Sequence, residues 1–198
     1  MTNRHKLVSS LAISWLALVA SPRASRAQDG NDLQLRNSVT VLGGAFMYDM
    51  ASDAYLPFVS GSLGRSLSRF VELEGTLSYA RLTTTLYSLT PSITSYNVRT
   101  PFLAADARAN LMLPLGRFVP YVGASVGAFR RNAIHDSSNG IYGPAVSGSS
   151  LGAAVGARLL LTPRVGLRGE FHYRQDSHNG FTSPANDVAE SLGLMYRF

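Results

Sequence analysis

The sequence predicts an all-β protein, an eight-stranded antiparallel up-and-down barrel that follows a removable N-terminal segment. Three observations lead to this fold class. Stretches of about ten residues alternate between apolar and polar side chains, which is the period of a β-strand with two different faces. The connections between these stretches are alternately short and long. After residue 27 no stretch has a sustained helical period with capping residues.

The N-terminal segment has the composition of a secretory signal peptide. Arg4, His5 and Lys6 form a basic start, an apolar run covers 7–20, and small residues precede a cleavage site after Ala27. The apolar run is about 14 residues long, shorter than the roughly 20 that a membrane-spanning helix needs. We therefore predict a signal peptide over 1–27, a periplasmic N-terminal segment over 28–37 and a barrel over 38–198.

Removal of the signal peptide changes the charge balance. The full chain has 18 basic and 12 acidic residues, and Arg4, Lys6, Arg23 and Arg26 leave with the signal, so the mature chain has 14 − 12 = +2. The weak clustering of basic residues gives no support to nucleic-acid binding. The chain has no cysteine, which excludes disulfides, thiolate metal sites and cysteine catalysis. No histidine has a partner at metal-ligand spacing, so we expect neither a metal nor a cofactor.

Eight strands can be assigned along the mature chain. Four alternate clearly, over residues 71–79, 103–111, 165–174 and 188–198. Four others are rich in Gly, Ala and Val, over residues 39–48, 56–67, 118–130 and 151–161. Small residues suit either face of a sheet, so the sequence leaves the parity of the second group open.

The connections suggest a membrane protein. Short turns are expected at 66–69, 114–117 and 162–164, and longer connections at 49–55, 83–95, 131–149 and 175–187. Outer-membrane barrels have short periplasmic turns and long external loops. A soluble barrel has no strong reason to sort its connections in this way.

Alternation alone does not decide which face of the strands lies outside. A soluble ligand-binding barrel would have an apolar interior. Here the charged face mixes signs at close spacing, as charges packed in a narrow lumen require, and the mature chain has no lysine for a water-exposed surface. We therefore expect an outward apolar belt that includes Leu73, Leu103, Leu167 and Leu194. The predicted lumen charges are Glu72, Glu74, Asp106, Arg108, Arg168, Glu170, His172 and Arg174.

An eight-stranded barrel has an interior just wide enough for side chains to fill it. We therefore predict a lumen closed by these charged side chains. A small ion-conducting pore is the alternative use of the same residues.

The end of the last strand resembles a known signal. Leu192, Leu194, Tyr196 and Phe198 form a pattern similar to the C-terminal insertion signal that the outer-membrane assembly machinery recognises. The segments 61–80 and 119–128 resemble the OmpA transmembrane-domain and OmpX type of small barrel, the outer membrane protein beta-barrel domain family. The resemblance covers nearly all of the mature chain.

This resemblance implies an integral outer-membrane protein of a Gram-negative-type bacterium, with a structural or surface-interaction role. The implied partners are outer-membrane lipid and lipopolysaccharide, the assembly machinery, and an extracellular ligand contacted through loops 131–149 and 175–187. We expect a monomer.

An enzymatic alternative comes from the segment 173–180. It is similar in part to the lipid A deacylase motif Arg-x-His-x-Ser-Asn-x-Gly, which would make Ser177 the nucleophile and place Glu190 near the orienting acid. A serine nucleophile needs a base within hydrogen-bond reach. Gln175 stands at the histidine position, and its amide cannot accept the proton. We therefore favour a non-enzymatic role, with a lipid A deacylase-like hydrolase and a soluble periplasmic ligand-binding barrel as alternatives.

Overall fold

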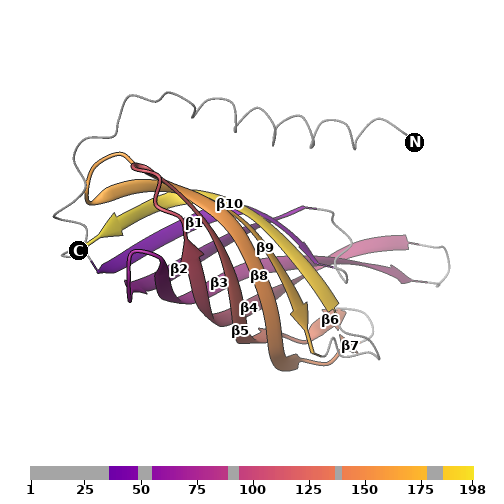
Figure 1. Ribbon diagram of the computed structural model, residues 1–198. Coiled ribbons are helices and arrows are strands. Elements are labelled where there is room, and N and C mark those ends of the chain that lie inside the picture. Colours follow the sequence, from indigo (N-terminus) through magenta and orange to yellow (C-terminus); the bar gives the residue numbers. More distant parts are fainter. Residues whose placement is uncertain (1–35, 49–54, 89–93, 137–139, 178–184) are drawn as a thin grey trace, which may run out of the picture. The chain divides into compact units, whose positions relative to one another are not determined.

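The computed structural model describes residues 36–48, 55–88, 94–136, 140–177 and 185–198 (Figure 1). The predicted signal peptide and residues 28–35 lie outside these ranges. Eight long strands are present: β1 (Asn37–Tyr48), β2 (Leu56–Ser66), β3 (Val71–Ser88), β4 (Thr94–Met112), β5 (Phe118–Arg131), β8 (Val146–Leu160), β9 (Val165–Asp176) and β10 (Ala185–Arg197). Two short strands, β6 (Ile134–Asp136) and β7 (Gly140–Gly143), form a hairpin between β5 and β8.

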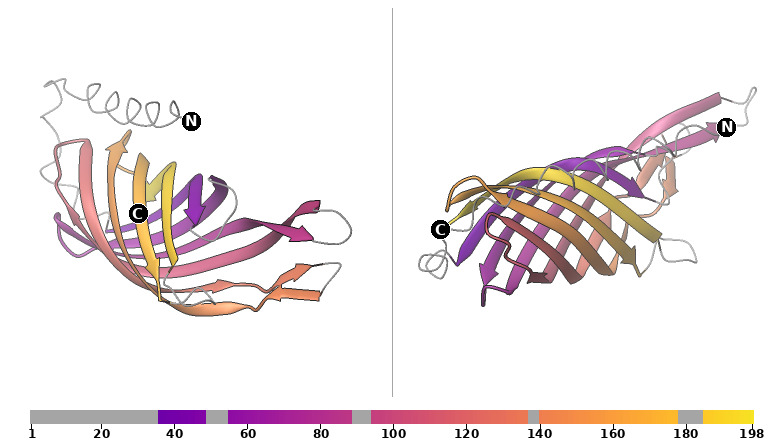
Figure 2. Two further views of the ribbon diagram at one scale, coloured as in Figure 1. Left: turned by 90° about the vertical axis from the view of Figure 1, so that its right-hand side faces the viewer. Right: turned by 45° about the horizontal axis from the view of Figure 1, so that its top comes forward.

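The eight long strands close into a barrel in the order β1-β10-β9-β8-β5-β4-β3-β2 (Figure 2). Every neighbouring pair is antiparallel, and β1 pairs with both β2 and β10. Asn37 and Phe198 exchange two backbone hydrogen bonds, at 3.0 and 2.9 Å, where the first and last strands meet. The predicted eight-stranded antiparallel up-and-down barrel is confirmed.

Two of the three short turns are built in the same way. Ser68 accepts hydrogen bonds through its hydroxyl from the backbone N–H groups of Phe70 and Val71, both at 3.1 Å. Thr162 does the same for Arg164 and Val165, at 3.2 and 2.9 Å. A hydroxyl that bonds to its own backbone two or three residues later stabilises a tight turn. The third turn has Gly116 with φ 67°, a left-handed conformation that glycine adopts at little cost.

The predicted long connections were partly wrong. Residues 83–88 and 94–95, expected in a loop, belong to β3 and β4, whose pairing runs out to Ser88 opposite Thr94. This stretch is rich in threonine and tyrosine, which favour extended backbone. The connection 131–149 contains the β6–β7 hairpin, and in the connection 175–187 both ends are strand.

The parity of the Gly- and Ala-rich strands is decided by the structure. On β5 and β8 the outward positions carry Val122, Val126, Leu151 and Val155, which are 53–64% exposed. The glycines of these strands alternate with them and point into the lumen. A Cβ on Gly156, for example, would lie 2.5 Å from the hydroxyl of Tyr121. The inward glycines therefore provide the space that larger lumen side chains occupy.

The outer face of the barrel is apolar. The four leucines expected there, Leu73, Leu103, Leu167 and Leu194, are 36–60% exposed, whereas the charged residues between them are buried. A contiguous apolar surface that encircles a barrel is unfavourable in water. This polarity contradicts the soluble barrel with an apolar interior and a charged exterior.

The seam of the barrel, where β1 pairs with β10 and closes the sheet, depends on two glycines. Gly44 and Gly193 lie on the lumen parity of these strands, and a Cβ on either would overlap a carbonyl oxygen of the opposite strand, that of Glu190 and of Val41 respectively. A clash with backbone cannot be relieved by a change of rotamer. These glycines therefore allow the close approach of the strands that close the barrel.

We predict that Gly193→Ala reduces the yield of folded barrel severalfold, because the added methyl group forces β1 and β10 apart. Folding into detergent micelles is measured by the shift in gel mobility between heated and unheated samples. Gly75→Ala is the matched control, since a Cβ there meets no atom within 4 Å. Equal yields for the two variants would contradict this account of the seam.

Candidate functional site

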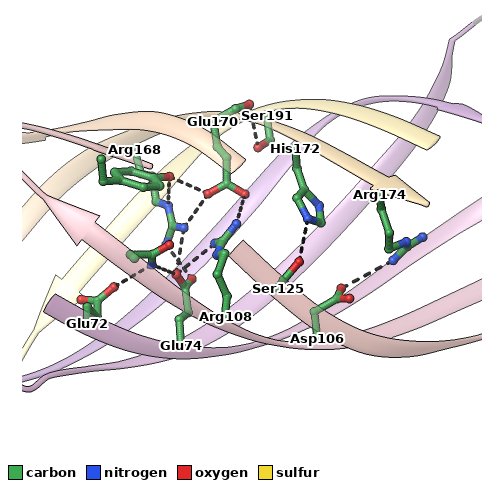
Figure 3. A network of polar contacts seen from close by, with 12 residues as sticks. Glu72, Glu74, Asp106, Arg108, Ser125, Arg168, Glu170, His172, Arg174 and Ser191 are labelled. Atoms are coloured by element: carbon green, nitrogen blue, oxygen red, sulfur yellow. Dashed lines mark hydrogen bonds and ion pairs between the residues drawn. The ribbon is translucent and has the colours of Figure 1, made fainter. Parts of the chain in front are cut away.

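The lumen near the turns contains a network of charged side chains (Figure 3). Its centre is Glu74 on β3, which is 3% exposed. Arg168 on β9 donates to both carboxylate oxygens of Glu74, from Nη1 at 2.6 Å and from Nη2 at 3.0 Å. Arg108 on β4 donates to the same carboxylate at 2.9 Å. Because β3 and β9 stand on opposite sides of the closed sheet, the Glu74–Arg168 pair crosses the lumen.

Glu170 is the second carboxylate of the network. It accepts hydrogen bonds from Arg108 Nη1 at 2.7 Å and from Arg168 Nη2 at 2.5 Å. The hydroxyl of Tyr121 donates to Glu170 at 2.5 Å and accepts from Arg168 Nε at 2.8 Å. The tyrosine therefore completes the hydrogen bonding between an acid and a base that are both buried.

Glu72 is the third carboxylate. Arg158 on β8 donates to both of its oxygens, from Nη1 at 2.9 Å and from Nη2. The side-chain amide of Asn110 donates to Glu74 at 2.8 Å and to Glu72 at 3.3 Å, which joins the two carboxylates. Three arginines and three glutamates give a formal charge of 3 − 3 = 0. Neutrality of this kind is what charges need when they are removed from water.

A second cluster lies nearer the long connections. Arg174 donates to Asp187 from Nε at 2.9 Å and from Nη2 at 2.5 Å. It also lies 3.5 Å from Asp106 and 3.2 Å from Asp176. Asp176 is fully buried, and neither of its oxygens accepts a hydrogen bond from a described residue. One guanidinium group thus faces three carboxylates, a formal charge of 1 − 3 = −2.

A small cavity of about 30 Å³, lined by both polar and apolar side chains, lies between the two clusters. Its lining includes Ser60, Thr76, Ser125 and His172, and His172 Nε2 lies 3.3 Å from Ser125 Oγ. A space of this size holds roughly two water molecules. A space this small is a water-sized pocket and not a channel through the lumen.

Aromatic side chains pack against the second cluster in the lumen. Phe102 is 1% exposed, and its ring centroid lies 5.4 Å from that of Phe46, 5.3 Å from that of Tyr48 and 6.0 Å from that of Phe129. The guanidinium carbon of Arg174 lies 5.1 Å from the centroid of Phe102. The described lumen is therefore blocked by two layers of side chains. The ionic layer, near the turns, is the network of Glu72, Glu74 and Glu170 with Arg108, Arg158 and Arg168. The aromatic layer, near the long connections, consists of Phe46, Tyr48, Phe102 and Phe129.

The structure places all eight predicted lumen residues on the inner face of the barrel. Six of them pair with one another: Glu74, Arg108, Arg168 and Glu170 form one network, and Asp106 lies beside Arg174 in the other. His172 lies within hydrogen-bond distance of Ser125 instead. In fact Glu72 pairs with Arg158, which the sequence analysis did not single out. Arg158 was missed because the parity of its Gly- and Ala-rich strand was ambiguous. Tyr121 was missed as well, and the aromatic layer was not anticipated.

Asp176 and Asp187 were missed for a different reason. Both fell inside the connection expected over 175–187. If the in-and-out alternation of β9 and β10 had been continued by a few residues into this connection, both side chains would have been placed in the lumen.

The residues of the enzymatic alternative do not form a site. Ser177 is exposed at the end of β9, and its hydroxyl accepts a hydrogen bond from the backbone N–H of Ser149 at 3.1 Å. Glu190 is exposed on the outer face of β10, opposite Phe171 in the register. Six residues of strand separate Phe171 from Ser177, roughly 20 Å at the usual rise. His178, the histidine that directly follows Ser177 in the sequence, lies outside the described residues.

Three arginines form a separate cluster on the outer face. Arg81 on β3, Arg99 on β4 and Arg130 on β5 are exposed, and they occupy outward positions on three adjacent strands. Arg81 lies opposite Pro101 and Arg130 opposite Leu103, so both are close to the edge of the apolar belt that is nearer the long connections. We call Arg81, Arg99 and Arg130 the outer arginine cluster.

Within the described residues, no helix is long and apolar enough to cross a membrane, and no group of three or more His, Asp or Glu side chains could hold a metal ion.

No protein-family model matches the sequence, and no curated protein matches it. Solved structures match it in fold. Neisserial surface protein A (NspA) has a TM-score of 0.65 at 14% identity, covering 82% of this chain and 97% of that chain. The fold is that of the small eight-stranded outer-membrane barrels.

Two further solved structures are similar to this chain in fold. Ail of Yersinia pestis, in complex with the heparin analogue sucrose octasulfate, has a TM-score of 0.54 at 13% identity, covering 82% of this chain and 97% of that chain. OprG from Pseudomonas aeruginosa has a TM-score of 0.53 at 12% identity, covering 83% of this chain and 97% of that chain. At these identities the similarity is one of fold.

We predict that Glu74→Gln lowers the free energy of unfolding by about 3–5 kcal/mol, because it leaves the buried Arg168 and Arg108 with one carboxylate fewer. Urea unfolding in detergent micelles provides the measurement. Glu190→Gln is the control, since Glu190 is exposed and forms no ion pair with another described residue; we expect it to change stability by less than about 0.5 kcal/mol. Similar losses for both variants would show that the lumen network is not what holds the barrel together.

Proposed function

We propose that this protein is an integral outer-membrane barrel with a closed lumen and a structural or surface-interaction role. The observation that carries the proposal is its polarity, because the charges pair inside the barrel and the large apolar side chains face outward. In a bilayer every backbone polar group must be paired internally, and a closed barrel satisfies this requirement. The fold shared with NspA and OprG supports the same location.

A structural or surface role fits the blocked lumen better than conduction. The ionic layer and the aromatic layer leave a cavity of only about 30 Å³ between them. An ion would have to displace buried, paired side chains to pass. The lumen charges therefore act as an internal brace between strands rather than as a selectivity filter.

The last strand supports membrane insertion. Leu192, Leu194, Tyr196 and Phe198 are all exposed on the outer face, and the rings of Tyr196 and Phe198 stack with centroids 6.3 Å apart. An apolar and aromatic edge suits recognition by the assembly machinery. We propose that this strand is the insertion signal, that the mature protein is a monomer, and that residues 1–27 direct its export.

A second candidate function is the binding of an anionic saccharide at the outer surface. The outer arginine cluster carries it, because three exposed guanidinium groups at the edge of an apolar belt suit phosphate or sulfate groups. Ail, which shares the fold, was solved with sucrose octasulfate. Lipopolysaccharide is the partner that presents phosphates at this depth of the membrane. The connections 131–149 and 175–187 would extend the same surface toward an extracellular ligand.

The membrane location can be tested on one strand. We predict that Val155→Arg, near the middle of the apolar belt, lowers the free energy of unfolding in lipid vesicles by about 2–4 kcal/mol, whereas Ser147→Arg lowers it by about 0–1 kcal/mol. Both positions are exposed on the outer face of β8. Urea unfolding of vesicle-embedded protein gives the two values. In a water-soluble barrel both substitutions would have small and equal effects, which would refute the proposal.

The saccharide-binding proposal predicts that replacing Arg81, Arg99 and Arg130 together by glutamine weakens lipopolysaccharide binding at least about tenfold. Each lost cation removes about 1 kcal/mol of attraction to an anionic surface. Isothermal titration of the folded protein in micelles measures the affinity, and the triple Arg→Lys variant, which keeps the charge, should retain most of it. Unchanged affinity in the glutamine variant, or equal affinity for lipopolysaccharide stripped of phosphate, would rule the site out.

A further inference from the structure

The rim of the barrel formed by the short turns is rich in arginine. Arg69, Arg117 and Arg164 come one from each turn, and Arg65 lies on the outer face of β2, two residues before the first turn. All four are exposed. None of the four forms an ion pair with another described residue, and none of the three turns contains an aspartate or glutamate. We call these four residues the turn arginines.

The same rim is apolar. Leu67, Phe70, Leu113, Leu115 and Leu161 lie in the turns beside the arginines and are 44–58% exposed. The guanidinium carbon of Arg69 lies 4.5 Å from the ring centroid of Phe70. Turns that face water are normally polar. Exposed leucines alternating with arginines are instead typical of segments at the boundary between hydrocarbon and headgroups, where cationic side chains reach outward from an apolar base.

The height of the apolar belt places this boundary at the turns. On and just after β4, the outward positions from Leu103 to Leu113 are all leucine or alanine. Ten residues of strand, tilted as in outer-membrane barrels, span about 25 Å, which is the height of the apolar band in such proteins. Arg99 lies beyond one edge of this belt. Leu113 therefore stands at the other edge, and Arg117 lies just past it.

We propose that the turn arginines bind anionic phospholipid headgroups of the leaflet that surrounds the turns. The argument from charge is that the four exposed cations have no aspartate or glutamate in the turns beside them, so they form a positive rim. The argument from position is that this rim coincides with the headgroup layer. The outer arginine cluster faces the opposite leaflet, so the barrel carries a separate anion-binding surface at each end. The inference rests on the proposed membrane location and adds a lipid preference to it.

The test measures lipid selectivity in vesicles of phosphatidylcholine mixed with phosphatidylglycerol. Electron spin resonance of spin-labelled lipids gives the association constant of each lipid with the folded barrel. We expect phosphatidylglycerol to be preferred by about fivefold, the factor that corresponds to about 1 kcal/mol for one cation at an anionic surface. The preference should fall as salt is raised, because the arginines are exposed.

The variant with Arg65, Arg69, Arg117 and Arg164 all replaced by glutamine should lose this preference. The matched control replaces the same four arginines by lysine, which keeps their charge, and it should keep the preference. If the fourfold variant does not fold, the single variants Arg69→Gln and Arg164→Gln should each lower the preference in part. No preference in the native protein, or equal loss in the control variant, would overturn the inference. A barrel that integrates into no vesicle would instead refute the membrane location itself.

Discussion

The narrow lumen of a closed eight-stranded barrel is the constraint on which the rest of this structure depends. Side chains from opposite strands meet across it, as Glu74 on β3 and Arg168 on β9 do at 2.6 Å. No layer of water separates such groups, so each charge needs a partner of opposite sign within hydrogen-bond distance. The three arginines and three glutamates near the turns meet this requirement almost completely.

The same constraint governs which strands are rich in glycine. An arginine that crosses the lumen takes up space that two facing side chains would otherwise share. Gly123 and Gly152 stand beside Arg108 and His172, and a Cβ on either would lie 3.0 Å or less from those side chains. Gly44 and Gly193 serve the closure of the sheet itself. Gly123 and Gly152 are therefore the counterpart of the large lumen side chains that they face.

The two ends of the barrel differ in chemistry. Near the turns the lumen is ionic and the rim carries arginine beside leucine. Near the long connections aromatic side chains pack against the second charged cluster, and the outer face carries the outer arginine cluster. The ionic layer ties together β3, β4, β8 and β9, and the aromatic layer draws in β1 and β5. Together the two layers contact strands all around the barrel, which favours a rigid body that presents its ends to two different surroundings.

The sequence by itself determined the strand count, the turns and the inward direction of the charged faces on β3, β4 and β9. Strict alternation fixes which residues share a face, and mixed charges without lysine indicate that this face is enclosed. The tertiary structure alone decided the rest. It paired Arg158 with Glu72, placed Asp176 and Asp187 beside Arg174, and packed Phe46 against Phe102 in a second layer. The Glu72–Arg158 and Phe46–Phe102 contacts join strands far apart in the chain, and only the register and closure of the barrel bring these side chains to the same depth.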